Sequence, residues 1–201
     1  MAAITISRHL GSGGATIAQA IAEELGYHLL DRELVDLVAQ ELSASPEKAL
    51  MLDERAFGWM TSVALSVLQA FQAERPITPE AYSFVSANVI REAAAAGNVV
   101  ILGRGAQAIL GKKPGTFHVH VVAALDARVI RIAERDGVGQ AEARRRIHES
   151  DNDRRAYVWS LGQRDWEDPL LYDLVLNTDR LTPESGARVI VLAARLAGVL
   201  K

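Results

Sequence analysis

The chain begins with the segment AITISRHLGSGGAT at residues 3–16, in which an apolar run leads directly into a cluster of glycines. Residues Ala3–Ser7 are apolar and partly β-branched, which predicts a short buried strand. After the glycines, apolar side chains recur at helical spacing at Ile17, Ile21 and Leu25, and Gly26 is suited to end that helix. The segment therefore predicts a strand, a glycine-rich turn and a helix in immediate succession.

This succession is a common way to bind a phosphate group. Glycines allow the backbone to approach an anion closely, and the N–H groups at the start of the helix point towards it. A glycine-rich turn without any ligand is the alternative interpretation. We predict that the turn binds phosphate through Gly11, Ser12, Gly13, Gly14, Ala15 and Thr16.

The rest of the chain alternates between strand-like and helical segments. Tyr27–Leu30 predicts a second strand, so residues 1–32 form a βαβ unit, which favours a parallel sheet. An Arg-rich helical region follows later, from Asp126 to about Tyr157. Three further strands are predicted at Asn98–Leu102, Phe117–Val122 and Asp173–Asn177. This alternation predicts an α/β fold with three layers.

Residues 33–97 differ from the rest because they look helical almost throughout. We expect a single domain over residues 1–201, with a core formed by residues 1–32 and 98–201 and a helical insert at residues 33–97. A dinucleotide-binding fold would need its third strand soon after the second, but the next strand begins only near Asn98.

The composition and the net charge exclude several classes of function. The 201 residues are 49% hydrophobic with a net charge of −3, which indicates a globular domain without a general attraction to nucleic acid or membranes. The chain has no cysteine, which excludes a thiolate nucleophile and a cysteine-ligated metal site. No apolar run approaches the ~18 residues of a membrane helix, and the first residues do not form a signal peptide. We expect a cytoplasmic enzyme that acts on a small molecule.

Further motifs follow the glycine-rich segment along nearly the whole chain. They are HLLDREL at residues 28–34, VILGRGA at 100–106, DNDRRAY at 151–157, and DP at 168–169 with YDLVLN at 172–177. With these motifs the chain resembles the cytidylate kinase-like family, which are P-loop relatives of bacterial cytidylate kinase. The resemblance implies a P-loop NTPase fold with a five-stranded parallel sheet in the order 2-3-1-4-5. It also implies that the insert binds a nucleoside monophosphate and that about residues 137–167 form an Arg-rich lid.

The resemblance further implies a function and a set of site residues. The expected activity is phosphoryl transfer from ATP, with Mg²⁺, to a nucleoside monophosphate, and CMP or dCMP is the expected acceptor. Arg104 corresponds to a residue that contacts the acceptor, and Arg154 and Arg155 correspond to lid arginines that contact phosphate. Asp31 and Arg32 end the second strand and face the same crevice as Arg104, and Asp31 is the better candidate of the two for binding or orienting the acceptor. A buried structural pair between Arg104 and Asp31 is the competing interpretation.

The phosphate loop departs from the motif of the family's kinases. That motif reads GxxxxGK followed by Ser or Thr, and here Arg8 stands at the first glycine, Gly14 at the lysine and Ala15 at the magnesium-binding hydroxyl. Arg8, Arg154 and Arg155 are therefore the candidates to supply catalytic positive charge. Restoring the usual residues, Gly14→Lys with Ala15→Ser, is expected to raise activity if the loop keeps its shape.

Two other functions remain open at this point. A nucleotide-binding regulatory protein with little kinase activity would explain Gly14 and Ala15. An NAD-dependent oxidoreductase would explain the imperfect GxGxxG pattern at Gly11 and Gly13, with Asp31 in the place of a ribose-binding acid.

Several other polar and aromatic residues are expected to be structural. Arg145 and Arg146 are expected to form ion pairs on a solvated helix face. His118 and His120 are two apart on one strand, but without a third ligand nearby we predict ordinary strand residues and no metal site. Packing roles are expected for Trp59, Trp159 and Trp166.

Overall fold

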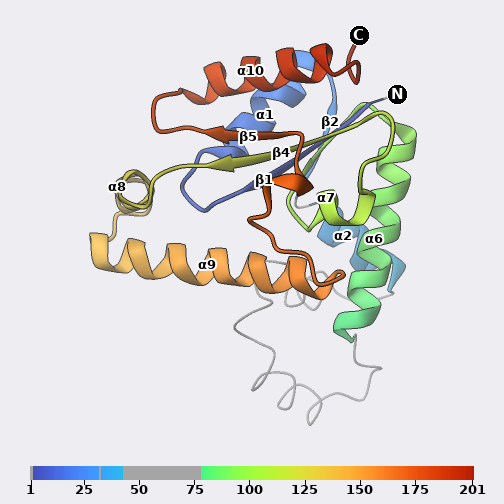
Figure 1. Cartoon of the computed structure of the whole chain (residues 1–201). Helices are drawn as coiled ribbons and strands as arrows, with labels where there is room; N and C mark the ends of the chain where they lie inside the picture. The colour runs from blue at the N-terminus through green and yellow to red at the C-terminus, as the bar shows by residue number, and fades with distance from the viewer. Residues whose placement is uncertain (1, 32, 43–77) are drawn as a thin grey trace.

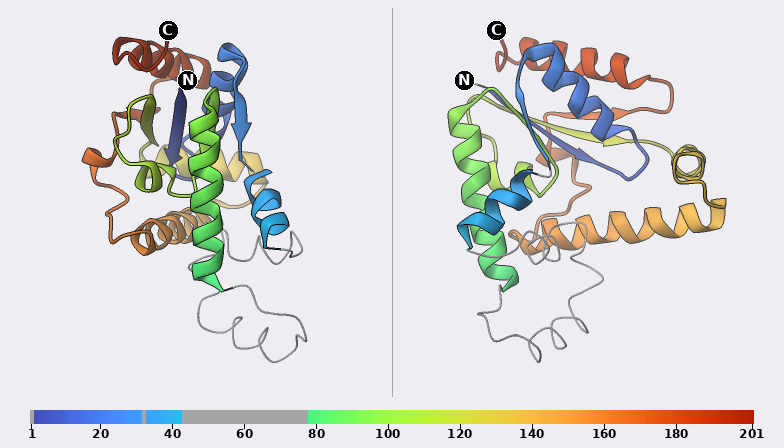
Figure 2. Two further views of the ribbon diagram at one scale, coloured as in Figure 1. Left: turned by 90° about the vertical axis from the view of Figure 1, so that its right-hand side faces the viewer. Right: turned by 180° about the vertical axis from the view of Figure 1, so that it is seen from behind.

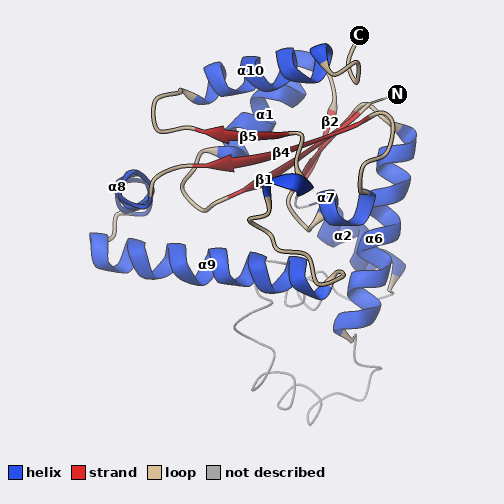
Figure 3. Cartoon of the chain, viewed as in Figure 1, coloured by secondary structure: helices blue, strands red, loops and turns tan. Residues whose placement is uncertain are grey.

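A computed structural model describes residues 2–31, 33–42 and 78–201 of the chain (Figure 1). Its strands are β1 (Ala3–Arg8), β2 (His28–Leu30), β3 (Val99–Leu102), β4 (Thr116–Val122) and β5 (Leu174–Asn177). They form one parallel sheet in the order β2-β3-β1-β4-β5 (Figure 3). The predicted strands and the order implied by the resemblance are confirmed, and each strand differs from its prediction by a single residue at one end.

Helices cover both faces of this sheet. On one face lie α1 (Gly14–Leu25) and α10 (Pro183–Leu196), and on the other lie α2 (Glu33–Glu41), α6 (Pro79–Ala96) and α7 (Ala106–Leu110). After β4 the chain forms α8 (Leu125–Asp136) and α9 (Gln140–Ser160), and a 3₁₀ turn at Pro169–Leu171 leads into β5. Figure 2 shows α10 on one side of the sheet and α9 on the other.

The apolar character of β1 follows from its place at the centre of the sheet. Every residue of β1 is buried, because Ile4 and Ile6 pack against α1 and α10 while Ala3 packs on the side of α2 and α6. The order of the strands reverses at β1, which has β3 on one side and β4 on the other. Open α/β sheets bind ligands at such a point, beyond the carboxyl ends of the strands. The glycine-rich turn after β1 lies there.

The helical segments agree with the expectations in part. Two helices, α2 and α6, belong to the expected insert, whereas residues 43–77, which include Trp59, lie outside the described residues. The Arg-rich region is two helices, since Gly137 takes a left-handed conformation with φ of 65° and ends α8. The short helix α7 was not predicted. No helix in the described ranges is long and apolar enough to cross a membrane.

The two faces of α10 should respond differently to truncation. Ile190 is fully buried between α10 and the sheet, whereas Leu192 on the same helix is 58% exposed. We expect Ile190→Ala to lower the free energy of unfolding by about 2–5 kcal/mol, because it leaves a cavity in the core. Leu192→Ala should change it by less than about 0.5 kcal/mol. Urea denaturation of both variants measures the difference, and equal losses would contradict this description of the core.

Candidate phosphate-binding site

The turn between β1 and α1 has a conformation that requires glycine at two positions. Gly11 has φ of 82° and Gly13 has φ of 84°, a region that other residues rarely adopt. Ser12 is fully buried, and both its N–H and its hydroxyl donate to the carbonyl oxygen of His9. Gly13 is the N-cap residue of α1 and provides no side-chain cap, and the first turn of α1 has no acidic residue. The start of α1 is therefore suited to an anion.

A cavity of about 430 Å³ opens over this turn. Its lining includes Gly11, Gly13, Gly14, Ala15 and Thr16 from the predicted loop, together with Arg8 from β1, Arg131 and Arg135 from α8 and Arg154 from α9. Among the described residues that line the cavity there is no carboxylate, whereas four are arginines. Two of the four also pair with carboxylates outside the lining, Arg135 with Asp136 and Arg154 with Asp151. The guanidinium groups around the glycine loop still form a surface that fits an anion.

Two of these arginines were not among the predicted site residues. Arg131 Nη2 donates to the carbonyl oxygen of Thr178 at 2.9 Å, and its Nη1 lies 3.3 Å from the carbonyl oxygen of Gly11. Arg131 therefore connects α8 to the loop and to the end of β5. The spacing of Arg128, Arg131 and Arg135 places all three on one helix face, and that spacing is the signal that could have identified them.

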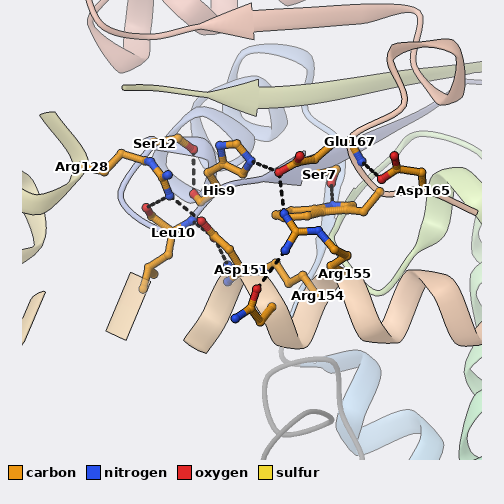
Figure 4. Close-up of polar contacts among 12 residues, drawn as sticks. Ser7, His9, Leu10, Ser12, Arg128, Asp151, Arg154, Arg155, Asp165 and Glu167 are labelled. Carbon is orange, nitrogen blue, oxygen red and sulfur yellow. Dashed lines mark hydrogen bonds and ion pairs between the residues drawn. The ribbon is translucent and has the colours of Figure 1, made fainter. Parts of the chain in front are cut away.

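Asp151 fixes the loop to α8 and α9. Its Oδ1 accepts a hydrogen bond from the backbone N–H of Leu10 at 2.9 Å, and its Oδ2 accepts one from Arg128 Nη1 at 2.5 Å (Figure 4). The same Arg128 nitrogen lies 3.3 Å from the carbonyl oxygen of Leu10. Both backbone polar groups of Leu10 are thus held by this ion pair, whose side chains are 9% and 13% exposed.

The two predicted lid arginines do not lie together. Arg154 is 6% exposed, lines the cavity and lies 3.4 Å from the Asp151 carboxylate. Arg155 donates instead to Glu167 at 2.7 Å, and its guanidinium lies 6.0 Å from the centre of the Trp166 ring. Consecutive residues of a helix point in different directions, so only Arg154 lines the cavity. The phosphate contact of Arg155 stays a prediction.

The predicted acceptor residues lie at the ends of β2 and β3. Arg104 is 1% exposed, and its Nη1 donates to Asp31 Oδ1 at 2.7 Å and to the carbonyl oxygen of Leu102 at 3.0 Å. The competing interpretation, a buried pair with Asp31, is therefore present in the structure. Asp31 keeps 26% of its side chain exposed, and Arg32 lies outside the described residues.

An aromatic cluster supports the loop. The rings of His9, His120 and Trp166 pack edge to face at centroid distances of 5.1–5.2 Å, and His120 stacks on Tyr172 at 4.7 Å. Trp166 Nε1 donates to Ser7 Oγ at 2.7 Å. Burial lowers the pKa of His9, and burial together with the nearby His9 lowers the pKa of His120 to about 3. Both rings are therefore neutral at physiological pH.

The structure also decides the expectations about structural residues. His118 is a strand residue whose ring nitrogens contact Thr5 Oγ1 and the carbonyl oxygen of Gly111, both at 2.8 Å. Trp166 is buried as predicted, whereas the packing role predicted for Trp159 is wrong, because this residue is 55% exposed. No group of three or more potential metal ligands occurs within the described residues.

The expected ion pairs on α9 are confirmed. Arg145 binds Glu142 and Glu149, and Arg146 binds Glu142 and Asp136. These hydrogen bonds lower the pKa of Glu142 to about 2.

Comparison with known proteins identifies relatives over most of the chain. The sequence pattern of the cytidylate kinase-like family matches residues 3–180. A cytidylate kinase from Pyrococcus horikoshii is 32% identical over 191 residues, which cover 95% of this chain and 86% of the relative. A cytidylate kinase from Thermococcus sibiricus is 30% identical over 192 residues, with coverage of 95% and 86%.

Solved structures share the fold at lower sequence identity. An uncharacterized protein from Eubacterium ventriosum superposes with a TM-score of 0.71 at 22% identity, covering 96% of this chain and 97% of that one. A shikimate kinase from Acinetobacter baumannii, solved with shikimate, gives a TM-score of 0.54 at 14% identity and covers 100% and 96%.

Removing the charge of Asp151 should destabilise the protein more than removing an exposed ion pair. In Asp151→Asn the buried Arg128 loses its carboxylate, so we expect the free energy of unfolding to fall by about 3 kcal/mol. Arg145→Ala breaks exposed pairs on the same helix and should leave it nearly unchanged. Urea denaturation tests both, and an equal effect of the two variants would show that Asp151 does not fix the loop.

Stability should also depend on the protonation of His120. The unfolded chain binds a proton at this ring near pH 6.5, whereas the folded protein does not until about pH 3. The free energy of unfolding should therefore fall as the pH is lowered from about 7 to 5. In His120→Phe, which can still stack on Tyr172, this fall should be smaller. Denaturation at both pH values gives the comparison, and parallel curves would refute the prediction.

Proposed function

Because the chain belongs to the cytidylate kinase-like family, we propose that it is a nucleoside monophosphate kinase that uses ATP and takes CMP or dCMP as acceptor. The observation that carries this proposal is the cavity over the glycine loop, lined by arginines from β1, α8 and α9. Phosphoryl transfer depends mainly on positioning the phosphates and neutralising their charge, and such a surface can do both.

In the proposed reaction an oxygen of the acceptor phosphate attacks the γ-phosphorus of ATP. The bond between this phosphorus and the β–γ bridging oxygen breaks, and ADP leaves with the bond's electron pair. The loop residues Gly11–Thr16 would hold the β-phosphate through backbone N–H groups. Arg8 and Arg154 would neutralise the charge on the oxygens of the transferred group, where it is largest in the transition state.

A second cavity beside the loop can accommodate the base of ATP. A smaller cavity of about 120 Å³ adjoins the loop and shares Gly13 and Arg131 with the larger one. Apolar side chains of Ile17, Leu181 and Pro183 contribute to its lining. The planar guanidinium of Arg131 can stack on a base as well as bind phosphate, so we assign Arg131 to the region between base and phosphates.

We assign acceptor binding to Asp31 and Arg32, and we assign to Arg104 the positioning of Asp31. The pair between Asp31 and Arg104 supports this assignment, because it fixes the orientation of a carboxylate that stays partly exposed at the carboxyl end of β2. The deeply buried Arg104 acts as a positioning residue in this arrangement.

Family membership also implies Mg²⁺ with ATP. The described hydroxyl groups that line the cavity belong to Thr16 and Ser150, and Ala15 stands where the usual motif has a magnesium-binding hydroxyl. These residues do not fit an ion held by the protein. We therefore treat Mg²⁺ as part of the MgATP substrate, coordinated by phosphate oxygens and water.

A regulatory nucleotide-binding protein with little turnover is the second candidate, favoured by Gly14 and Ala15 in place of lysine and a hydroxyl residue. The oxidoreductase interpretation is not supported. In a dinucleotide-binding sheet the second strand lies beside the first, whereas here β3 lies between β1 and β2.

The test is ADP formation from MgATP with a panel of nucleoside monophosphates. We expect turnover that is greatest with CMP or dCMP. Arg154→Ala should lower kcat on the order of 10³-fold, with a smaller effect on KM, because the charge it neutralises develops in the transition state. Arg145→Ala, a matched loss of charge on the exposed face of the same helix, should leave kcat unchanged.

Two results would contradict the kinase proposal. The first is ATP binding by calorimetry without turnover on any nucleoside monophosphate, which would favour the regulatory candidate. The second is equal activity of the Arg154 and Arg145 variants, which would remove Arg154 from the reaction.

A further inference from the structure

Gly14 differs from the other glycines of the phosphate loop in the reason for its presence. It is the first residue of α1 and does not have a positive φ, whereas Gly11 and Gly13 do. Its backbone conformation therefore does not require glycine, because residues with a side chain adopt helical φ and ψ without strain. Something other than backbone geometry must account for glycine at this position.

The side chain of Arg8 accounts for it. A Cβ atom on residue 14 would lie 2.5 Å from Arg8 Cβ and 3.1 Å from Arg8 Cγ. These atoms are at the root of the Arg8 side chain, next to the backbone of β1, so they cannot move aside as a flexible end could. Consequently Arg8 and any side chain at position 14 exclude one another.

The residue types at these two positions are the reverse of those in the phosphate-loop motif. In GxxxxGK the first position is glycine and the seventh is lysine, whereas this chain has arginine at position 8 and glycine at position 14. Arg8 is the last residue of β1, is 5% exposed and lines the cavity over the loop. An arginine stays charged when buried, and its planar fork can bind two phosphate oxygens.

We propose that the cation of the phosphate loop has been exchanged between these two positions, so that Arg8 at the end of β1 binds the β- and γ-phosphates of ATP. Gly14 is then the residue that leaves room for Arg8. The proposal rests on the proposed function for the identity of the ligand, and it explains why the loop has no lysine. It also predicts that arginine at position 8 and a side chain at position 14 are alternatives.

This proposal corrects an expectation from the sequence. Gly14→Lys with Ala15→Ser was expected to raise activity, but the new Cβ would meet Arg8 at 2.5 Å. That substitution alone is therefore expected to disturb the loop. A lysine at position 14 becomes acceptable only when Arg8 is replaced by glycine in the same variant.

The test compares ATP affinity and melting temperature in four variants of the full chain. Gly14→Ala adds only a Cβ atom, which clashes with Arg8 Cβ. It should therefore lower both the melting temperature and the ATP affinity. Arg8→Gly should lower ATP affinity at least about tenfold, as expected for the loss of a charge-assisted contact. Arg8→Gly with Gly14→Ala should regain the melting temperature relative to Gly14→Ala but not the affinity. Arg8→Gly with Gly14→Lys should regain both.

The last two variants form the decisive comparison, because both relieve the clash and only one restores the cation. Equal ATP affinity of these two would overturn the proposal, as would ATP affinity of Arg8→Gly equal to that of wild type. If the double variants fold poorly, the ATP affinities of Arg8→Gln and Arg8→Lys test the proposal instead. Both variants keep Gly14 and therefore avoid the clash with residue 8. The exchange is supported if Arg8→Gln loses ATP affinity while Arg8→Lys keeps part of it. Equal ATP affinities of these two variants refute it.

Failure of this proposal can be separated from failure of the proposed function. ATP affinities that follow the expected pattern without turnover on any nucleoside monophosphate would reject the kinase but keep the exchange. Turnover with CMP or dCMP and unchanged ATP affinity in Arg8→Gln would keep the kinase but reject the exchange.

Discussion

The buried carboxylate of Asp151 is the contact that connects the glycine-rich loop after β1 to α8 and α9. It holds the N–H of Leu10 and the guanidinium of Arg128, which itself contacts the carbonyl oxygen of Leu10. Because these groups come from the loop, α8 and α9, none of the three can move independently without breaking a buried charge pair. The position of Arg154 over the loop depends on the same carboxylate.

Positive charge in this site comes from arginines on several elements, and this has a physical consequence. Arginine remains charged when buried, whereas a buried lysine can lose its proton. The aromatic cluster below the loop adds no charge of its own, since burial lowers the pKa of His9 and of His120. The charge offered to an anion is therefore set by the arginines and does not vary with pH near neutrality.

Packing around β1 places these features beyond the carboxyl ends of the strands. β1 is buried on both faces and leads directly into the loop, so the loop has a fixed position relative to β4, whose His120 packs against His9. Trp166, from the segment that returns from α9 to β5, completes this packing through its hydrogen bond to Ser7. The segment between α9 and β5 is thereby connected to the central strand as well as to the loop.

The sequence by itself determined the local structure. The strands and the glycine-rich turn follow from hydrophobic period and glycine placement within short windows, and the sheet order followed from the family resemblance. Only the tertiary structure decided which charged groups meet. The bond between Leu10 and Asp151 joins residues 141 positions apart. Helix geometry alone points Arg154 and Arg155 in different directions, but the tertiary structure decided that Arg154 lines the cavity and Arg155 meets Glu167. Trp159 is exposed although its apolarity suggested burial. The exclusion between Arg8 and Gly14 belongs to the same class. A contact between elements depends on the relative placement of two backbones, which no local pattern of residues encodes.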